Sequence, residues 1–328
     1  MIRRDEAEKR EIIHLVEHSA LSVKKTLDEL QVPRSTFYRW YKQYLAEGEA
    51  GLVDHSPNPH QIWNRIPKEV RQEVVELALE HPDRSPRQIA WLFTDQKGYF
   101  ISESSTYRIL KRFDLVESPA FRVMTAAEKY QHPTKHIHEL WQTDFTYFKI
   151  QGWGWYYLST VLDDFSRYII AWKLTPTMSA TDVQETLLLA LASTGLDQAL
   201  VQHRPRLLSD NGSCYVSGEL RAFLEQRHIE HTRSAPYHPM TQGKIERYHR
   251  SMKNIVNLQN YFLPTELEVE IASFVNYYNH QRYHESLDNL TPADVYFGRA
   301  KEVLTKRDHI KKRTLQQRRL QNLQTPAV

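Results

Sequence analysis

The spacing of the hydrophobic residues changes near Leu140, and this change divides the chain into parts that fold differently. Up to about residue 115, apolar residues recur at helical spacing and strand patterns are almost absent. Beyond Leu140, aromatic and β-branched residues predict three strands, at residues 141–150, 156–162 and 168–174. Helices and short strands then alternate, which is typical of a mixed α/β domain. We therefore expect a multidomain chain with an all-α N-terminal region, an α/β core and a helical C-terminal segment.

The all-α region contains two helix-turn-helix patterns. In the first, Pro33 breaks the chain and Ser35 can cap a helix that carries basic residues on one side. In the second, helices are expected at residues 70–79, 86–93 and 102–113. Short helices joined by a tight turn, the last of them basic, are typical of modules that read the major groove of DNA.

Composition limits the class of protein. The 328 residues are 41% hydrophobic and 25% charged, and the net charge of +3 permits a polyanionic partner without requiring one. The longest apolar run, residues 187–192, is far shorter than the roughly 20 residues that cross a bilayer. The first residues lack an apolar signal-peptide core, and Cys214 is the only cysteine, which excludes an internal disulfide. We expect a soluble cytoplasmic protein with no membrane partner.

Three carboxylates stand out by their surroundings. Asp144 lies inside an apolar strand, Asp210 ends a short apolar strand, and Glu246 lies near the start of a long helix expected at residues 241–258. A buried carboxylate is costly unless it is paired or binds a cation. Each residue taken alone has an ordinary explanation, since Asp210 opens an Asp-Asn-Gly turn sequence and strand aspartates often lie at edges. Taken together, they suggest a metal site.

The second half of the chain resembles the DDE transposases of bacterial insertion sequences, whose core is similar to retroviral integrase and has the ribonuclease-H-like fold. Thirty-five residues separate Asp210 from Glu246, the spacing for which this family is known. The resemblance covers about residues 140–298. Its markers are Trp-Gln-Thr-Asp at 141–144, Asp-Asp-Phe-Ser-Arg at 163–167, Ser-Asp-Asn-Gly at 209–212, His-Pro-Met-Thr-Gln-Gly-Lys-Ile-Glu-Arg at 238–247 and Tyr-Asn-His-Gln-Arg-Tyr-His at 278–284.

The resemblance implies a transposase that binds the terminal inverted repeats of its element, cleaves the ends and joins the 3′-hydroxyls to target DNA. It makes Asp144, Asp210 and Glu246 the catalytic and metal-binding residues, holding two Mg²⁺ ions, with Mn²⁺ as a substitute. The partners would be double-stranded DNA and further copies of the chain, as a dimer or larger assembly on DNA. The protein would then be associated with the bacterial nucleoid.

Combined with the sequence patterns, the resemblance predicts seven segments. They are a helix-turn-helix domain (1–50), a linker (51–64), a second helix-turn-helix domain (65–116), a linker (117–138), a ribonuclease-H-like catalytic core (139–260), its helical end (261–300) and a basic C-terminal tail (301–328). The tail, with eight Lys or Arg and two acids between residues 301 and 320, could bind the DNA backbone or be a disordered, solvated end.

Several polar and basic residues are candidates for DNA contacts. From Glu246, the residues four and seven positions along the helix are both basic, so a cationic strip would run beside the metal site. Recognition helices use their N-terminal polar residues for bases and phosphates. The candidates are Arg34, Ser35, Thr36, Arg39, Ser104, Ser105, Arg108, His238, Gln242, Lys244, Arg247, Arg250 and Lys253.

Other polar residues favour structural roles. Asp163 and Asp164, between two strands, are expected to shape a hairpin or to pair with Arg167 rather than to bind metal. Cys214 has no surroundings that would lower its pKa and is expected to be structural. The cluster of His132, His136 and His138 lacks the cysteine pair of a retroviral zinc module, so we interpret it as a polar linker.

Two other functions remain open. A transcriptional regulator derived from a transposase would keep the two DNA-reading modules and use the core for assembly alone. A ribonuclease acting on RNA–DNA hybrids would share the fold. Metal-dependent nicking of a terminal-repeat duplex would separate the transposase from the regulator, and preference for a hybrid substrate would favour the ribonuclease.

Overall fold

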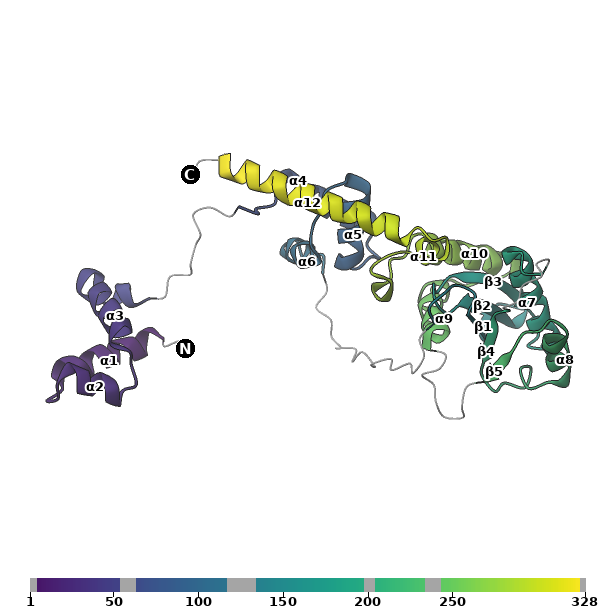
Figure 1. The fold of residues 1–328 in the computed structure, drawn as a ribbon, viewed down its shortest axis with the longest axis horizontal. Coiled ribbons are helices and arrows are strands. Elements are labelled where there is room, and N and C mark those ends of the chain that lie inside the picture. Colours follow the sequence, from purple (N-terminus) through teal and green to yellow (C-terminus); the bar gives the residue numbers. More distant parts are fainter. Residues whose placement is uncertain (1–4, 54–62, 117–133, 198–203, 234–242, 325–328) are drawn as a thin grey trace. The chain divides into compact units, whose positions relative to one another are not determined.

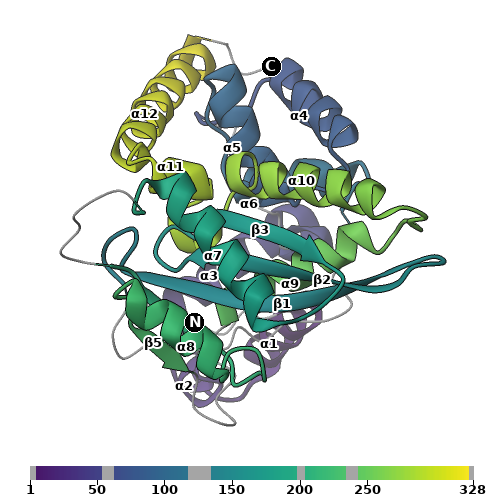
Figure 2. The same ribbon diagram turned by 90° about the vertical axis from the view of Figure 1, so that its right-hand side faces the viewer.

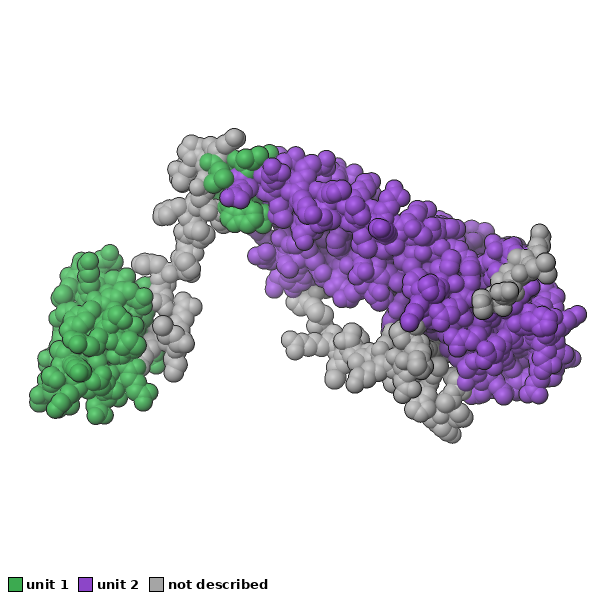
Figure 3. All heavy atoms as spheres, in the orientation of Figure 1, with its two compact units in different colours: residues 1–65, 320–328 green, residues 66–319 purple. Residues whose placement is uncertain are grey.

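A computed structural model of the chain describes residues 5–53, 63–116, 134–197, 204–233 and 243–324. The chain divides into two compact units (Figure 3), the first formed by residues 1–65 and 320–328 and the second by residues 66–319. The second helix-turn-helix segment thus belongs to the same compact unit as the core, so the predicted boundary between them does not separate compact units. Within the described residues, no helix is long and apolar enough to cross a membrane.

The first unit contains a helical module (Figure 1), built from α1 (Glu6–His18), α2 (Val23–Glu29), α3 (Arg34–Glu47) and η1 (Gly48–Leu52). Asp5 and Glu8 form a reciprocal capping box at the start of α1. α3 begins one residue before the expected cap, because Pro33 occupies the cap position and Ser35 makes no cap bond. Phe37 and Trp40 are buried in the core of this module. The predicted linker at 51–64 begins later than expected, since residues 51 and 52 belong to η1 and are buried; residues 54–62 lie outside the described residues.

The second helix-turn-helix segment consists of α4 (Lys68–Glu80), α5 (Pro86–Lys97) and α6 (Glu103–Arg112). Ser85 caps α5 through a capping box with Gln88, and Ser102 caps α6 by accepting a hydrogen bond from the Ser105 amide. The buried residues Ile89 and Phe93 lie in the apolar cluster of this segment. These signals are local, which explains why the helices were predictable within a few residues.

The core is built on a five-stranded sheet in the order β3-β2-β1-β4-β5. β1 pairs antiparallel with β2 and parallel with β4; β2 pairs antiparallel with β3, and β4 pairs parallel with β5. The mixed sheet confirms the expected α/β class of the core. The strands are β1 (Leu140–Ile150), β2 (Gly154–Asp163), β3 (Ile169–Thr175), β4 (Arg206–Ser209) and β5 (His231–Arg233).

Helices cover both faces of this sheet (Figure 2), which is why successive side chains are buried at the start of β1 and at the end of β2. One apolar cluster joins Leu207 and Val161 to α7 (Ala180–Thr194) and α8 (Gly218–Gln226). The other joins Phe148 and Leu158 to α9 (Gly243–Val256) and α10 (Pro264–His280). Because side chains alternate along a strand, Asp144 lies on the same face as Phe148 and therefore faces α9.

Two short helices, η3 (Glu285–Leu287) and α11 (Pro292–Tyr296), precede a final helix that reaches residue 324. The basic C-terminal segment was predicted either to bind the DNA backbone or to be a disordered end. It forms the long helix α12 (Ala300–Gln324). Its buried positions recur at helical spacing, at Arg307, Ile310, Thr314 and Arg318. Two of the eight basic residues of the predicted tail are therefore part of a packed seam rather than solvated charges.

Candidate active site

Asp144 lies in the middle of β1, opposite Thr160 of β2, and is about one-fifth exposed. Its Oδ1 accepts a hydrogen bond from the Phe145 amide at 2.8 Å, and its Oδ2 lies 3.4 Å from Nδ1 of His249 on α9. Nε2 of His249 is in turn 3.4 Å from Oγ1 of Thr160. β1, β2 and α9 together therefore hold this carboxylate in one orientation.

Asp210 and Glu246 reach the same neighbourhood from other elements. Asp210 follows the last residue of β4, and its Oδ1 accepts a hydrogen bond from the Gly212 amide at 2.8 Å. Burial and the charge of Asp144 raise its pKa, although the Gly212 hydrogen bond opposes the shift. Glu246 lies in the first turn of α9, and burial and the same Asp144 charge raise its pKa against the opposing charges of Arg250 and His249.

Asp144 is thus the common neighbour of the other two predicted carboxylates. Its negative charge acts on both, so the topology brings together three acids that are far apart in the sequence. In the part of the chain that the structure describes, no three Asp, Glu, His or Cys side chains are close enough to enclose a metal ion. The three acids therefore influence one another electrostatically, but their side chains do not enclose a space for a metal ion.

The basic residues expected along α9 divide into two groups. Arg250 is exposed and its charge lowers the pKa of Glu246, while Lys253 lies within the electrostatic reach of Asp144 and places Nζ 4.1 Å from the centre of the Tyr147 ring. The charges of both side chains therefore interact with those of the carboxylates. Burial lowers the pKa of Lys253, and the Asp144 charge opposes that shift.

Lys244 has a different position from the one expected for a DNA contact. Its Nζ lies 2.7 Å from Oδ2 of Asp164, whose side chain is 2% exposed, and donates to the Asp164 carbonyl at 2.9 Å. The other Asp164 oxygen accepts a hydrogen bond from Gln142 Nε2, and Gln142 Oε1 accepts from the Ile245 amide. This network ties the start of α9 to the turn after β2. It also corrects the expected pairing, because the partner of Asp164 is Lys244 and not Arg167.

Asp163 shapes the same turn, as expected. It is fully buried and accepts hydrogen bonds from the amide and hydroxyl of Ser166 and from the His138 amide. Burial raises its pKa against these hydrogen bonds. Cys214 is buried, and its surroundings raise the pKa of the thiol to about 11, which agrees with a structural role.

The helix-turn-helix candidates lie mainly on exposed surfaces. Arg34, Ser35 and Arg39 are exposed on α3, and Thr36 is half-buried. On α6, Ser104 and Arg108 are exposed and joined by a hydrogen bond from Arg108 Nε to the Ser104 carbonyl, whereas Ser105 is half-buried and takes part in the cap. His238 and Gln242 lie outside the described residues.

His249 is the site residue that sequence reasoning missed. It is 6% exposed and lies three residues after Glu246, so it faces the sheet from the same side of α9. Its spacing of three residues from Glu246 is the signal that could have indicated it, whereas the predicted cationic strip contains only Arg250 and Lys253.

Comparison with known proteins matches separate segments of the chain to domain families. Residues 135–239 and 227–292 match two models described as "Integrase core domain", and residues 3–53 and 36–110 match two described as "Homeodomain-like domain". The chain therefore combines segments that match an integrase core domain with segments that match homeodomain-like helix-turn-helix modules.

Its relatives include transposases of insertion sequences. The chain is 27% identical over 158 residues to the transposase of IS904 from Lactococcus lactis, covering 48% of this chain and 60% of that protein. It is 28% identical over 156 residues to transposase InsF of IS3A from Escherichia coli, covering 46% and 51%. It thus spans about half to three-fifths of these relatives. The solved catalytic core of HTLV-2 integrase in complex with magnesium is 22% identical, with a TM-score of 0.39, over 49% of this chain and 97% of that one.

Proposed function

We infer that the protein is a metal-dependent DNA transposase that binds the ends of its own element, cleaves them and joins the freed 3′-hydroxyls to target DNA. The observation that carries this inference is the grouping of Asp210 and Glu246 around Asp144 in an integrase core domain. The relatedness to insertion-sequence transposases supports the same class of reaction. The test is whether the purified chain, given Mg²⁺ and a labelled duplex from the element's end, nicks that end and joins it to a plasmid.

The chemistry of the three carboxylates suits divalent cations. Carboxylate oxygens are the hard ligands that Mg²⁺ and Mn²⁺ prefer, and burial together with the Asp144 charge raises the pKa of Asp210 and of Glu246, an unfavourable charge state that a cation would relieve. Asp144, Asp210 and Glu246 would hold two such ions. When bound, the ions would activate the attacking hydroxyl and stabilise the leaving oxygen of an in-line displacement at phosphorus.

The chain's own residues would position the reactants. His249 and the Phe145 amide hold the two oxygens of Asp144 in place, so this carboxylate is oriented before DNA arrives. Arg250 and Lys253 would bind phosphates that flank the scissile bond. No protein nucleophile and no ATP are required, because the attacking groups are water and then the 3′-hydroxyl of the DNA.

Stability without metal should depend on the cost of ionising Asp210 and Glu246, which comes from their burial and from the Asp144 charge. Asp210 has an ordinary pKa of 3.8 and Glu246 one of 4.5, and both are raised in the folded chain, so the folded state holds these protons more tightly than the unfolded state. Ionisation therefore lowers stability as the pH rises through these values, and the loss persists at neutral pH. We expect Asp210→Asn to melt at a higher temperature than wild type at pH 7 without metal, with the difference shrinking near pH 3.

The same melting experiment tests metal binding. A cation at 100 times its Kd should stabilise the wild-type chain by about 2.7 kcal/mol and Asp210→Asn by much less. Glu225→Gln, on the exposed surface of α8, provides the matched control and should respond to Mg²⁺ like wild type. Equal Mg²⁺ shifts in wild type and Asp210→Asn would remove Asp210 from the metal site.

The exposed basic residues of α3 and α6 would read the terminal repeats. Loss of one good base contact costs roughly 1–3 kcal/mol, so Arg39→Gln and Arg108→Gln should each weaken binding to an end duplex while changing affinity for unrelated DNA much less. Arg10→Gln, which removes an exposed ion pair with Glu49, is the control. Anisotropy titrations at one salt concentration make the comparison, and equal losses on specific and unrelated duplexes would contradict base reading.

Joining two ends requires two active sites near each other, so the proposed active form is a dimer or larger assembly on DNA. A protein–DNA complex that performs strand transfer with one copy of the chain would contradict this part of the proposal. The regulator and the ribonuclease remain the competing functions; end binding without nicking would favour the first, and preference for an RNA–DNA hybrid the second.

A further inference from the structure

Three arginines lie within electrostatic range of two aromatic rings beside α9, and we call this group the arginine cluster. Arg167 comes from the turn between β2 and β3, Arg247 from α9 and Arg282 from the segment after α10. The rings of Tyr278 and His284 lie 4.9 Å apart and nearly perpendicular, and the guanidinium carbon of Arg282 lies 5.7 Å from the Tyr278 ring centre. The positive charges of all three arginines act on both rings. Three cations from three elements thus converge on one small region.

Arg167 has a buried side chain and an unusual backbone conformation. Its side chain is 8% exposed. Its backbone has a φ of +63°, in the left-handed region that residues other than glycine rarely adopt. Its amide donates a 2.8 Å hydrogen bond to the Asp163 carbonyl, which anchors the turn. Its Nε is shielded from water and finds no hydrogen-bond partner in the described parts of the chain. A buried donor without a hydrogen-bond partner is costly unless a ligand accepts from it.

His284 contributes a second polar atom with the same property. Its Nε2 is buried and has no hydrogen-bond partner among the described residues. Burial and the charges of the three arginines lower its pKa to about 3, so the ring is neutral and can donate one N–H.

We propose that Arg167, Arg247, Arg282 and His284 form a binding site for a phosphodiester of duplex DNA next to the carboxylate group. Guanidinium groups match phosphate oxygens with paired N–H donors, and a phosphate would satisfy the shielded donors while offsetting the repulsion among the three cations. Arg247 directly follows Glu246 in α9, so the phosphate site borders the helix that carries this carboxylate. This inference rests on the proposed function, because it adds a backbone clamp to the same DNA-bound core.

The salt dependence of DNA binding tests the clamp. Each phosphate contact that a cation makes contributes about 0.9 to the slope of log K against log salt concentration. Without divalent metal, Arg282→Gln in the full chain should weaken binding of an unrelated 20-base-pair duplex about 10-fold and lower this slope by about 0.9. Arg282→Lys should keep the slope, because it keeps the charge. Arg221→Gln, exposed on α8, should leave both quantities unchanged.

Arg247→Gln is a second variant in case Arg282→Gln does not fold. The Arg247 side chain is exposed, so we expect the melting temperature of this variant to be nearly unchanged. It should lower the slope in the same direction as Arg282→Gln. Unchanged slopes in both variants would overturn the clamp and make the cluster part of the packing of the core. If the clamp variants behave as wild type while Asp144→Asn abolishes joining, the clamp fails and the transposase stands. If the slopes fall while Asp144→Asn joins DNA normally, the clamp stands and the proposed chemistry fails.

Discussion

Asp144→Asn, Asp210→Asn and Glu246→Gln should each abolish cleavage and joining of an end duplex in Mg²⁺ while leaving DNA binding intact. Metal ions supply several kcal/mol of transition-state stabilisation, and each ~1.4 kcal/mol is a factor of ten in rate. We therefore expect losses on the order of a thousand-fold or more. The largest loss is expected for Asp144→Asn, because Asp144 is the common neighbour of the other two acids. Gel assays of nicking and strand transfer, with binding followed separately, provide the measurement.

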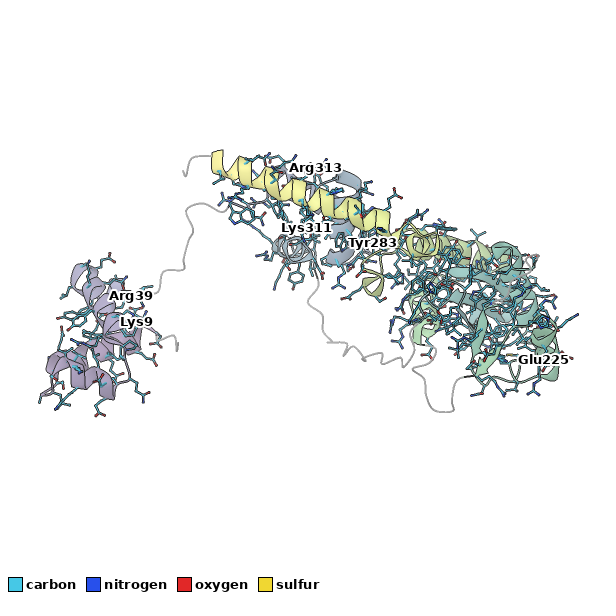
Figure 4. All side chains as sticks on the ribbon, in the orientation of Figure 1. Lys9, Arg39, Glu225, Tyr283, Lys311 and Arg313 are labelled. Atoms are coloured by element: carbon cyan, nitrogen blue, oxygen red, sulfur yellow. The ribbon has the colours of Figure 1, made fainter. Side chains whose placement is uncertain are left out.

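Two further substitutions serve as comparisons in this assay. Glu225→Gln removes an exposed carboxylate of α8 (labelled in Figure 4) and should retain full activity. His249→Gln removes the imidazole that contacts Asp144 and should lower the rate without abolishing it, because neighbouring groups that orient a metal ligand typically contribute roughly 10- to 100-fold. Near-normal strand transfer by any one of the three carboxylate variants would remove that residue from the proposed metal site.

Local patterns predicted the elements of this chain well, because they are set by caps and by residue type. Strand β1 and the position of Asp144 in it follow from the aromatic and β-branched residues of this segment, and the start of α6 follows from Ser102. The meeting of Asp144 with Asp210 and Glu246 is different. It depends on the β3-β2-β1-β4-β5 order, which no local pattern contains, and was expected only because the motifs resemble those of a known family.

Two basic residues form ion pairs with partners far away in the sequence, which local patterns could not predict. Lys244 is a predicted DNA contact, yet it pairs with Asp164, 80 residues away. Arg307 lies in the segment predicted to bind the DNA backbone or to be a solvated end, yet it pairs with Asp95, 212 residues away. A basic residue whose partner is so distant has the same local pattern as one that is exposed, so spacing cannot distinguish them.

The pair of Arg307 and Asp95 is expected to control how firmly α12 packs against α5. Arg307 is 4% exposed and donates from Nε and Nη2 to the two Asp95 oxygens at 2.9 and 2.7 Å. Its guanidinium carbon lies 4.5 Å from the centre of the Trp91 ring, and the Tyr283 hydroxyl (Tyr283 is labelled in Figure 4) donates to Asp95 at 2.7 Å. Such a bidentate, stacked geometry is specific to arginine.

Arg307→Met should therefore destabilise this packing by about 3 kcal/mol, the lower end for breaking a buried ion pair, because Asp95 keeps partial exposure and the Tyr283 hydroxyl. Lys312→Met, which breaks an exposed pair with Asp308 on the same helix, should cost no more than about 0.5 kcal/mol.

Hydrogen exchange of peptides from α5 and α12 measures the loss where it occurs, so the result does not depend on how the two compact units unfold. The double variant Asp95→Asn with Arg307→Met separates the pair from the packing of either side chain. It should be more stable than the sum of the two single losses predicts, because the second substitution removes a charge that the first left without its partner. Strictly additive losses would mean that α12 is held by the Trp91 stacking and the Thr314 and Arg318 contacts, with the ion pair contributing nothing of its own.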